Sequence, residues 1–271
     1  MFDHSYVRAG ETAVDLGRGG YMLIQPKRGY KFGTDAVLLA AFAAGIGERR
    51  CLDLCAGSGV VSLLMLGRRN LAASGKIALA ASGEIAIAAS GKIADADFVG
   101  IELQRDYADM AERSFAANGL NGRARIIPGD VRDIRALTPA ASFDVVTANP
   151  PYIPANGGLP GADASVDICR RETACTLADV ARAAKYALRP GGSFVCVHRP
   201  KRLGDIFEVF GGQSLGITSL RFVHPKADRA PTALLVHARR GMRPELNVLP
   251  PLILRDADGG YTREARSIYN D

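Results

Sequence analysis

The amino-acid sequence predicts an α/β protein with a doubly wound, mostly parallel sheet. Short apolar runs alternate with helical stretches along most of its 271 residues, and this alternation is typical of parallel sheets covered by helices. The first apolar run enters a glycine turn that opens a helix, which is how nucleotide-binding β-α-β units begin. Polar side chains stand where successive predicted strands end, and open α/β sheets bind ligands at that edge.

The elements follow in order along the chain. Residues 12–25 alternate in polarity around Gly17-Arg18-Gly19-Gly20, which predicts a hairpin. Thr34 or Asp35 can cap the apolar helix that follows, so residues 1–47 are expected to form an N-terminal hairpin and helix. Further strands are predicted at 51–55, 97–102, 124–127, 142–148, 193–198, 217–223 and 232–238, and helices at 60–66, 107–118 and 177–188.

Residues 71–94 consist of three near-identical octads, LAASGKIA, LAASGEIA and IAASGKIA. Solenoid repeats have periods of about 20 residues or more, so these octads are too short to form one. We expect an insertion at the amino ends of the strands, tolerated within a single domain that spans residues 1–271. The alternative is an exposed β-arm that associates with a second copy.

Composition narrows the class of protein. The chain is 48% apolar, enough for a sizeable core, and its five cysteines form no Cys-x-x-Cys pair and have no histidine at metal-ligand spacing. We therefore expect a reduced, cytoplasmic protein without a metal, and with no signal peptide or membrane span. The net charge of +6 suits a polyanionic partner, although a mildly basic surface explains it equally well. The oligomeric state stays open.

The tetrapeptide Asn149-Pro150-Pro151-Tyr152 follows the predicted strand at 142–148. An exocyclic amine or a carboxamide is a poor nucleophile because its lone pair is conjugated. The Asn149 amide oxygen and the Pro150 carbonyl can accept the two N–H hydrogens of such a group and hold it in place. Tyr152 offers a flat face to a base extruded from its stack. The same residues also form ordinary turns, so the rest of the chain must decide.

The predicted first strand and its turn read Asp53-x-Cys55-x-Gly57-x-Gly59. The turn lacks the third glycine of dinucleotide loops, which disfavours a nicotinamide cofactor and fits a ligand without phosphates, such as S-adenosylmethionine. Asp53 and the backbone near Gly57 can meet its ammonium, Glu102 its ribose hydroxyls and Asp130 its adenine edge. Each acid could instead cap a helix or lie in solvent.

With these residues in order, the chain resembles class I S-adenosylmethionine-dependent methyltransferases of the Asn-Pro-Pro-Tyr group. More narrowly, it is similar to the bacterial tRNA1(Val) adenine-37 N6-methyltransferase family. The narrower resemblance rests on residues 32–39, Arg171-Glu172, and the tail segments 225–228, 249–253 and 260–269. It covers the whole chain except the octads. It implies a Rossmann-like methyltransferase fold with a seven-stranded sheet.

The resemblance also implies roles for individual residues. The methionine part of the donor would lie on Asp53, Cys55, Gly57 and Gly59, the ribose on Glu102, and the adenine on Asp130 and Val131. Gly33, Thr34 and Asp35 would close over the cofactor, and Asn149, Pro150 and Tyr152 would hold the target base, with Asn149 also facing the donor. Cys55-Ala56 departs from the glycine-rich sequence of many relatives.

A tRNA substrate would need cations for its phosphates. The candidates are Lys27, Arg28, Lys31, Arg170, Arg171, Lys201, Arg202, Lys226 and Arg229, although any of them could be ordinary solvated surface. The tetrapeptide fits other amines equally well. N5-methylation of a release-factor glutamine is one alternative because Ile153 follows Tyr152, and it is disfavoured because only about fifty residues precede Cys51. Guanine-N2 methylation of ribosomal RNA and a non-catalytic RNA-handling scaffold are the others.

Overall fold

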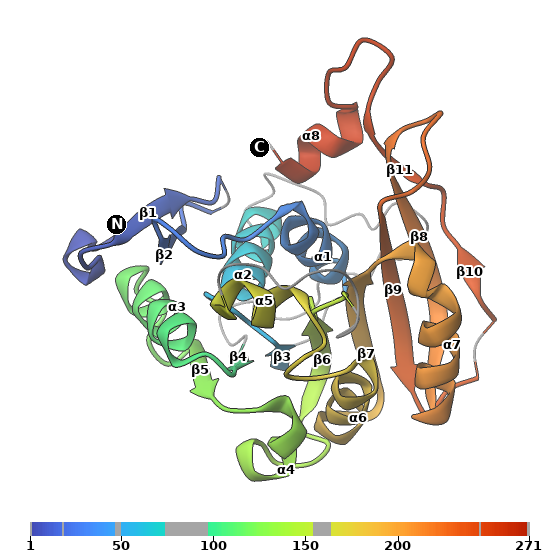
Figure 1. Ribbon diagram of the computed structural model, residues 1–271, viewed down its shortest axis with the longest axis horizontal. Coiled ribbons are helices and arrows are strands. Elements are labelled where there is room, and N and C mark those ends of the chain that lie inside the picture. The colour runs from blue at the N-terminus through green and yellow to red at the C-terminus, as the bar shows by residue number, and fades with distance from the viewer. Residues whose placement is uncertain are drawn as a thin grey trace.

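The computed structural model describes residues 2–17, 19–46, 50–73, 97–153, 164–243 and 245–269. In this part of the chain the main sheet has nine strands, with β10-β8-β9-β7-β6-β3-β4-β5 as its order and β11 paired to β8 (Figure 1). The central strands are β3 (Arg50–Leu54), β4 (Asp97–Glu102), β5 (Ala124–Pro128), β6 (Phe143–Ala148) and β7 (Leu188–His198), all mutually parallel. β9 (Ala233–Arg240) is antiparallel to both β7 and β8 (Leu215–Lys226). The predicted mostly parallel sheet is confirmed.

Helices cover both faces of this sheet, as a doubly wound fold requires. One core cluster joins the strands to α1 (Thr34–Ala44), α2 (Val60–Ala73) and α3 (Arg105–Ala117), and the other joins them to α6 (Leu177–Ala187) and α7 (Leu203–Gly212). Val145 and Val146 are adjacent in β6 and belong to opposite clusters. This follows from the two-residue period of a strand that is buried on both faces.

The strand count is where the sequence prediction is wrong. The tail adds two short strands, β10 (Asn247–Val248) and β11 (Leu252–Arg255), in parallel along the outer edge of β8. Arg221 of β8 is buried and fixes this tail, since it donates to the Pro250 carbonyl at 3.0 Å and pairs with Glu264 at 2.7 Å. Glu264 lies on α8 (Arg263–Tyr269), which contacts both α1 and β11. Strands this short have no hydrophobic period of their own.

The predicted N-terminal hairpin is confirmed as β1 (Glu11–Asp15) and β2 (Met22–Pro26), a separate two-stranded sheet whose β2 packs on α3. Arg113 of α3 fixes the hairpin, because its guanidinium donates two hydrogen bonds to the Glu11 carboxylate, at 2.6 and 2.7 Å.

The prediction that Thr34 or Asp35 caps α1 is wrong, because the cap residue is Gly33, which has no side chain to cap the helix. The shorter helices are η1 (His4–Tyr6), η3 (Val131–Asp133), α4 (Ile134–Leu137), α5 (Ala164–Arg170) and η4 (Pro200–Arg202).

The octads lie outside the described residues apart from 71–73, which end α2. Their role as an insertion, like the single-domain organisation, stays a prediction. β4 begins at Asp97, so the connection from α2 enters the sheet at the amino end of that strand. The site lies at the opposite, carboxyl edge.

Candidate active site

A pocket of about 840 Å³, including space open to solvent, lies at the carboxyl ends of β3, β4, β5 and β6. α5 passes across these strand ends (Figure 1). The lining includes Cys55–Ser58 after β3, Glu102–Gln104 after β4, Gly129–Val131 after β5, Asn149 and Pro151 after β6, and Ile168, Cys169, Ala174 and Cys175.

The turn between β3 and α2 is built on left-handed backbone. Cys55, Gly57 and Gly59 have φ angles of 59°, 55° and 81°. A Cβ on Gly59 would lie 2.7 Å from Cζ of Phe115, so glycine is required for both backbone and space. The predicted glycine turn is therefore confirmed, and Cys55 adopts a conformation that few residues other than glycine adopt.

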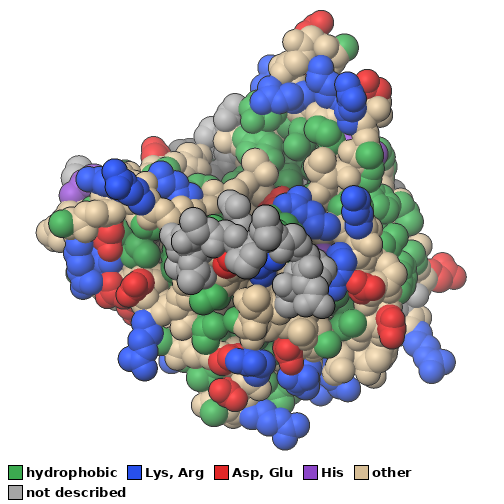
Figure 2. Space-filling model, in the orientation of Figure 1, with side chains coloured by type: hydrophobic (Ala, Val, Ile, Leu, Met, Phe, Trp, Pro, Cys, Tyr) green, Lys and Arg blue, Asp and Glu red, His purple; other side chains and the backbone are tan. Residues whose placement is uncertain are grey.

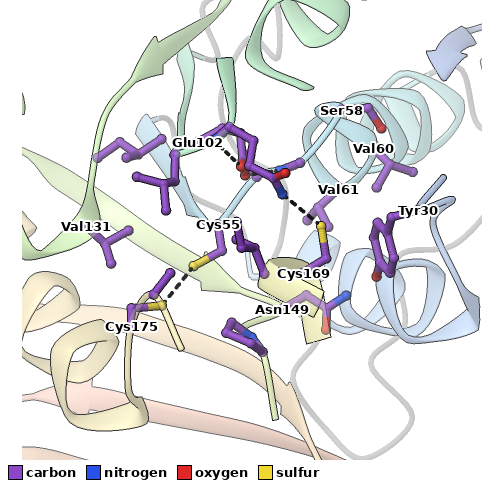
Figure 3. Close-up of a pocket in the computed structure, with 18 of the residues that line it drawn as sticks. Tyr30, Cys55, Ser58, Val60, Val61, Glu102, Val131, Asn149, Cys169 and Cys175 are labelled. Carbon is purple, nitrogen blue, oxygen red and sulfur yellow. Dashed lines mark hydrogen bonds between the residues drawn. The ribbon is translucent and has the colours of Figure 1, made fainter. Parts of the chain in front are cut away.

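Glu102 stands at the end of β4 and points into the pocket (Figure 3). Its two carboxylate oxygens accept hydrogen bonds from the backbone N–H groups of Gly57 and Gln104, both at 2.8 Å. Burial raises the pKa of the Glu102 carboxyl. Each oxygen keeps lone-pair capacity for one more donor, so the carboxylate is already oriented to accept from a vicinal diol.

Asp53 is buried at the end of β3, with 3% of its surface exposed, and does not itself line the pocket. Thr147 of β6 donates to Oδ1 at 2.7 Å, while Oδ2 has no hydrogen-bond partner among the described residues. Burial raises the pKa of Asp53 to about 7. A buried carboxylate oxygen without a donor is costly, and a nearby cation would stabilise it.

Asp130 and Val131 follow β5 and both line the pocket. Val131 is buried and supplies an apolar wall. Asp130 already accepts from the Arg132 backbone at 2.8 Å and pairs with its guanidinium at 2.6 Å, which lowers the pKa of Asp130. An adenine amine would therefore share this carboxylate with Arg132.

Asn149 follows β6 and reaches the pocket half-buried. Its side-chain amide makes no hydrogen bond to any residue that the structure describes. Pro150 is buried and does not line the pocket, whereas Pro151 does. An amide at the pocket edge that has no partner among the described residues can accept a hydrogen bond from an amine.

Tyr152 lies beyond the pocket lining, with the Arg199 guanidinium 4.0 Å from its ring centroid. The chain that leaves the tetrapeptide is fixed by Glu172, whose backbone donates to the Ile153 carbonyl at 2.8 Å. Arg202 binds the Glu172 carboxylate at 3.1 Å and the Tyr152 carbonyl at 3.5 Å. Arg171-Glu172 therefore supports the backbone that carries Tyr152.

None of Gly33, Thr34 and Asp35 lines the pocket, so the expected closure over the cofactor is not supported by its lining. Asp35 pairs instead with Arg199 at 3.3 Å. The neighbouring Tyr30, Phe32 and Ala36 form this wall. No sequence pattern predicts these residues at the site, nor Cys169 and Cys175, which the fold brings from a distant segment. Cys55 and Cys175 contact each other, with their sulfur atoms 3.9 Å apart (Figure 3).

Of the nine basic candidates, two are held in ion pairs, five are exposed and Lys226 is half-buried, while the side chain of Arg170 lies outside the described part of the chain. Arg171 and Arg202 are poorly placed to contact phosphates, because Arg171 is 8% exposed and pairs with Asp167 while Arg202 pairs with Glu172 and Asp205. Lys27, Arg28, Lys31, Lys201 and Arg229 are exposed. Figure 2 shows Lys and Arg side chains on the N-terminal unit and on the C-terminal loops, interspersed with acidic groups.

No protein-family model matches the chain. A tRNA1(Val) (adenine(37)-N6)-methyltransferase of Dickeya chrysanthemi is 28% identical over 89% of this chain and 87% of its own. The enzyme of the same name from Phocaeicola vulgatus is 25% identical over 76% and 75%, and that from Aeromonas hydrophila is 26% identical over 86% and 85%. The similarity therefore extends over most of the chain.

Two solved structures share the fold. A predicted O-methyltransferase of Agrobacterium tumefaciens is 24% identical with a TM-score of 0.62, covering 87% of this chain and 95% of that chain. The Thermus thermophilus 16S rRNA N2 G1207 methyltransferase, in complex with AdoMet and guanosine, is 22% identical with a TM-score of 0.53, covering 86% and 51%. Together with the relatives, they indicate an S-adenosylmethionine-dependent methyltransferase.

Two further findings concern the described part of the chain alone. None of its helices is both long and apolar enough to cross a membrane. No group of three or more His, Cys, Asp or Glu side chains is arranged there to hold a metal ion.

Proposed function

We propose that this S-adenosylmethionine-dependent methyltransferase methylates the exocyclic amine of an adenine in tRNA, and that adenine-37 N6 of tRNA1(Val) is its specific target. The observation that carries the proposal is the amide of Asn149 at the edge of the pocket, which has no hydrogen-bond partner among the described residues and lies within an Asn-Pro-Pro-Tyr sequence at a strand end. The names of relatives that are 23–28% identical over most of the chain support the choice of substrate.

The residues present fit the donor. Its ammonium and sulfonium are cations, and they would favour the charged form of the buried Asp53, whose Oδ2 has no hydrogen-bond partner among the described residues. Glu102 is oriented for the ribose diol, and Val131 and Asp130 would take the adenine. When bound, this donor supplies a methyl group on a positively charged sulfur, which is already an activated leaving group.

Asn149 and Pro150 would act on the amine. The Asn149 amide oxygen and the Pro150 carbonyl each accept one amine N–H, which turns the nitrogen lone pair toward the methyl carbon. Transfer would form the N–C bond as the S–C bond of the donor breaks and its sulfur leaves as a neutral thioether. Positive charge would then grow on the nitrogen, and these two acceptors would stabilise it more strongly than the neutral ground state. The nitrogen then loses one proton to water. No covalent enzyme intermediate is required.

Tyr152 would receive the extruded base on one face of its ring. Stacking on an aromatic side chain contributes about 1–3 kcal/mol per base, which offsets part of the cost of unstacking the nucleotide. The other face already carries the Arg199 guanidinium. Exposed cations such as Lys27, Arg28 and Lys31 would contact phosphates, so binding should weaken as salt rises.

The test is a transfer assay with a labelled methyl donor and three separate acceptors: bulk tRNA, ribosomal RNA and a release factor. We expect label in tRNA alone, and the amount of tRNA bound should fall steeply with added salt. Label in the release factor would replace the proposal with glutamine methylation. Label in ribosomal RNA would replace it with a ribosomal substrate, and label in none of the three would reject both the substrate and the role of the free amide.

A further inference from the structure

The geometry points to Arg199 as a positioning residue that fixes the ring of Tyr152 for base stacking. This inference deepens the proposed function and rests on it. β6 and β7 are neighbouring parallel strands (Figure 1). Arg199 directly follows β7 and Tyr152 lies just after β6, so both residues lie at the carboxyl edge of the sheet. The guanidinium carbon lies 4.0 Å from the ring centroid. A planar guanidinium at this distance stacks on an aromatic face.

The guanidinium is anchored on elements other than the one that carries Tyr152. Its Nη1 donates to the Thr232 carbonyl at 2.9 Å, just before β9, and its Nη2 donates to the Asp35 carboxylate at 3.3 Å, in the first turn of α1. The Arg199 backbone N–H donates to His198 Nδ1 at 2.9 Å. Arg199 therefore links α1, β7 and the start of β9, and both terminal nitrogens already have acceptors.

Two consequences follow for the substrate. The guanidinium covers one face of the Tyr152 ring, so a base has only the opposite face for stacking. Because the terminal nitrogens are bound to Asp35 and Thr232, the side chain is poorly placed to bind a phosphate instead. Arg199 would thus act on the substrate through Tyr152, by restricting the ring to one orientation, and would not act by contact with the RNA.

The first experiment needs no substrate. The protein is labelled with carbon-labelled tyrosine, the Tyr152 ring signal is assigned with Tyr152→Phe, and its NMR shift and linewidth are compared between the wild type, Arg199→Ala and Arg199→Lys. We expect the signal to move and broaden in Arg199→Ala and to be only partly restored in Arg199→Lys, which lacks the planar fork. An unchanged Tyr152 signal in a folded Arg199→Ala protein would overturn the inference whatever the substrate.

The second experiment measures kcat/KM for tRNA in a double-mutant cycle of Arg199→Ala and Tyr152→Ala. We expect Arg199→Ala to lower kcat/KM about tenfold alone and less than about twofold in the Tyr152→Ala background, because its effect runs through the ring. Equal losses in both backgrounds would overturn the inference and indicate direct RNA contact. A gain in the single variant would also overturn it and indicate that Arg199 blocks the base.

The matched control is Arg189→Ala. Arg189 lies at the amino end of the same strand, β7, and pairs with Asp144 at the start of β6. Its removal deletes an ion-paired arginine between the same two strands without touching the site, so kcat/KM should be unchanged. If the wild type transfers no methyl group to tRNA, the proposed substrate fails, while the Tyr152 signal still decides the role of Arg199.

Discussion

Thr147 donates a 2.7 Å hydrogen bond to one carboxylate oxygen of Asp53 and leaves the other oxygen without a partner among the described residues. The two side chains lie on adjacent parallel strands, β6 and β3, which register Asp53 opposite Thr147. Burial raises the pKa of Asp53 to about 7, so near neutral pH the carboxylate is poised between its charged and neutral forms. A cationic ligand that binds nearby should favour the charged form.

The first prediction concerns the affinity for S-adenosylmethionine. The charge of the donor is constant between about pH 5.5 and pH 7, whereas Asp53 begins to lose its proton over this range. The affinity of the protein for the donor should therefore rise with pH, by at most about tenfold per pH unit. Asp53→Asn should weaken binding at pH 7 and flatten the profile. Isothermal titration at several pH values measures both effects. If the affinity of Asp53→Asn for the donor rises with pH as steeply as that of the wild type, the pH dependence belongs to another group, such as Glu102.

The second prediction concerns the stability of the ligand-free protein. The folded-state pKa of Asp53 lies above its ordinary value of 3.8, so the folded state binds more protons than the unfolded state. The contribution of the protonated Asp53 to the free energy of unfolding is therefore complete below pH 3.8 and is lost as pH rises through about 7. Relative to Asp53→Asn, the wild type should therefore lose stability between about pH 4 and pH 8, by up to about 4 kcal/mol. Urea unfolding at each pH gives the difference, and a pH-independent difference would contradict this assignment.

The third prediction concerns Asn149. Asn149→Ala removes an acceptor that binds the amine most strongly in the transition state, so kcat should fall about 100-fold or more while donor affinity changes by less than about threefold. Single-turnover kinetics and donor titration separate the two quantities. Equal losses of kcat and donor affinity would show that Asn149 serves the donor and not the amine.

Much of the fold and part of the site follow from local patterns. Apolar runs indicate the buried strands. An acid or an amide at the end of such a run must lie at the carboxyl edge of the sheet, and Glu102 and Asn149 line the pocket for this reason. β10 and β11 were missed because two and four residues carry too little periodicity. The partner of Tyr152 was missed because Arg199 reaches it only through the pairing of β6 with β7. For the same reason the sequence does not predict the ion pair of Asp35 with Arg199.

The fourth prediction concerns Gly100 in the middle of β4. A Cβ there would lie 2.3 Å from Cδ1 of Ile126 and 2.9 Å from Cβ of Ala56, so Gly100→Ala should overpack the contact between β4 and the pocket turn and cost about 1–3 kcal/mol. Gly204→Ala in α7 is the control, because a Cβ there meets nothing within 4 Å, and it should be neutral or stabilising by up to about 1 kcal/mol. Thermal unfolding compares the two, and equal stabilities would contradict the predicted close packing.

The central claim is that the Asn-Pro-Pro-Tyr site places a methyl group on the amine of an adenine in tRNA. Nucleoside mass spectrometry of tRNA1(Val) treated with the protein and a labelled donor tests it most directly. We predict labelled N6-methyladenosine at one position, formed by the wild type and abolished by Asn149→Ala. Label that appears only in guanosine or cytidine, or N6-methyladenosine formed equally well by Asn149→Ala, would contradict it.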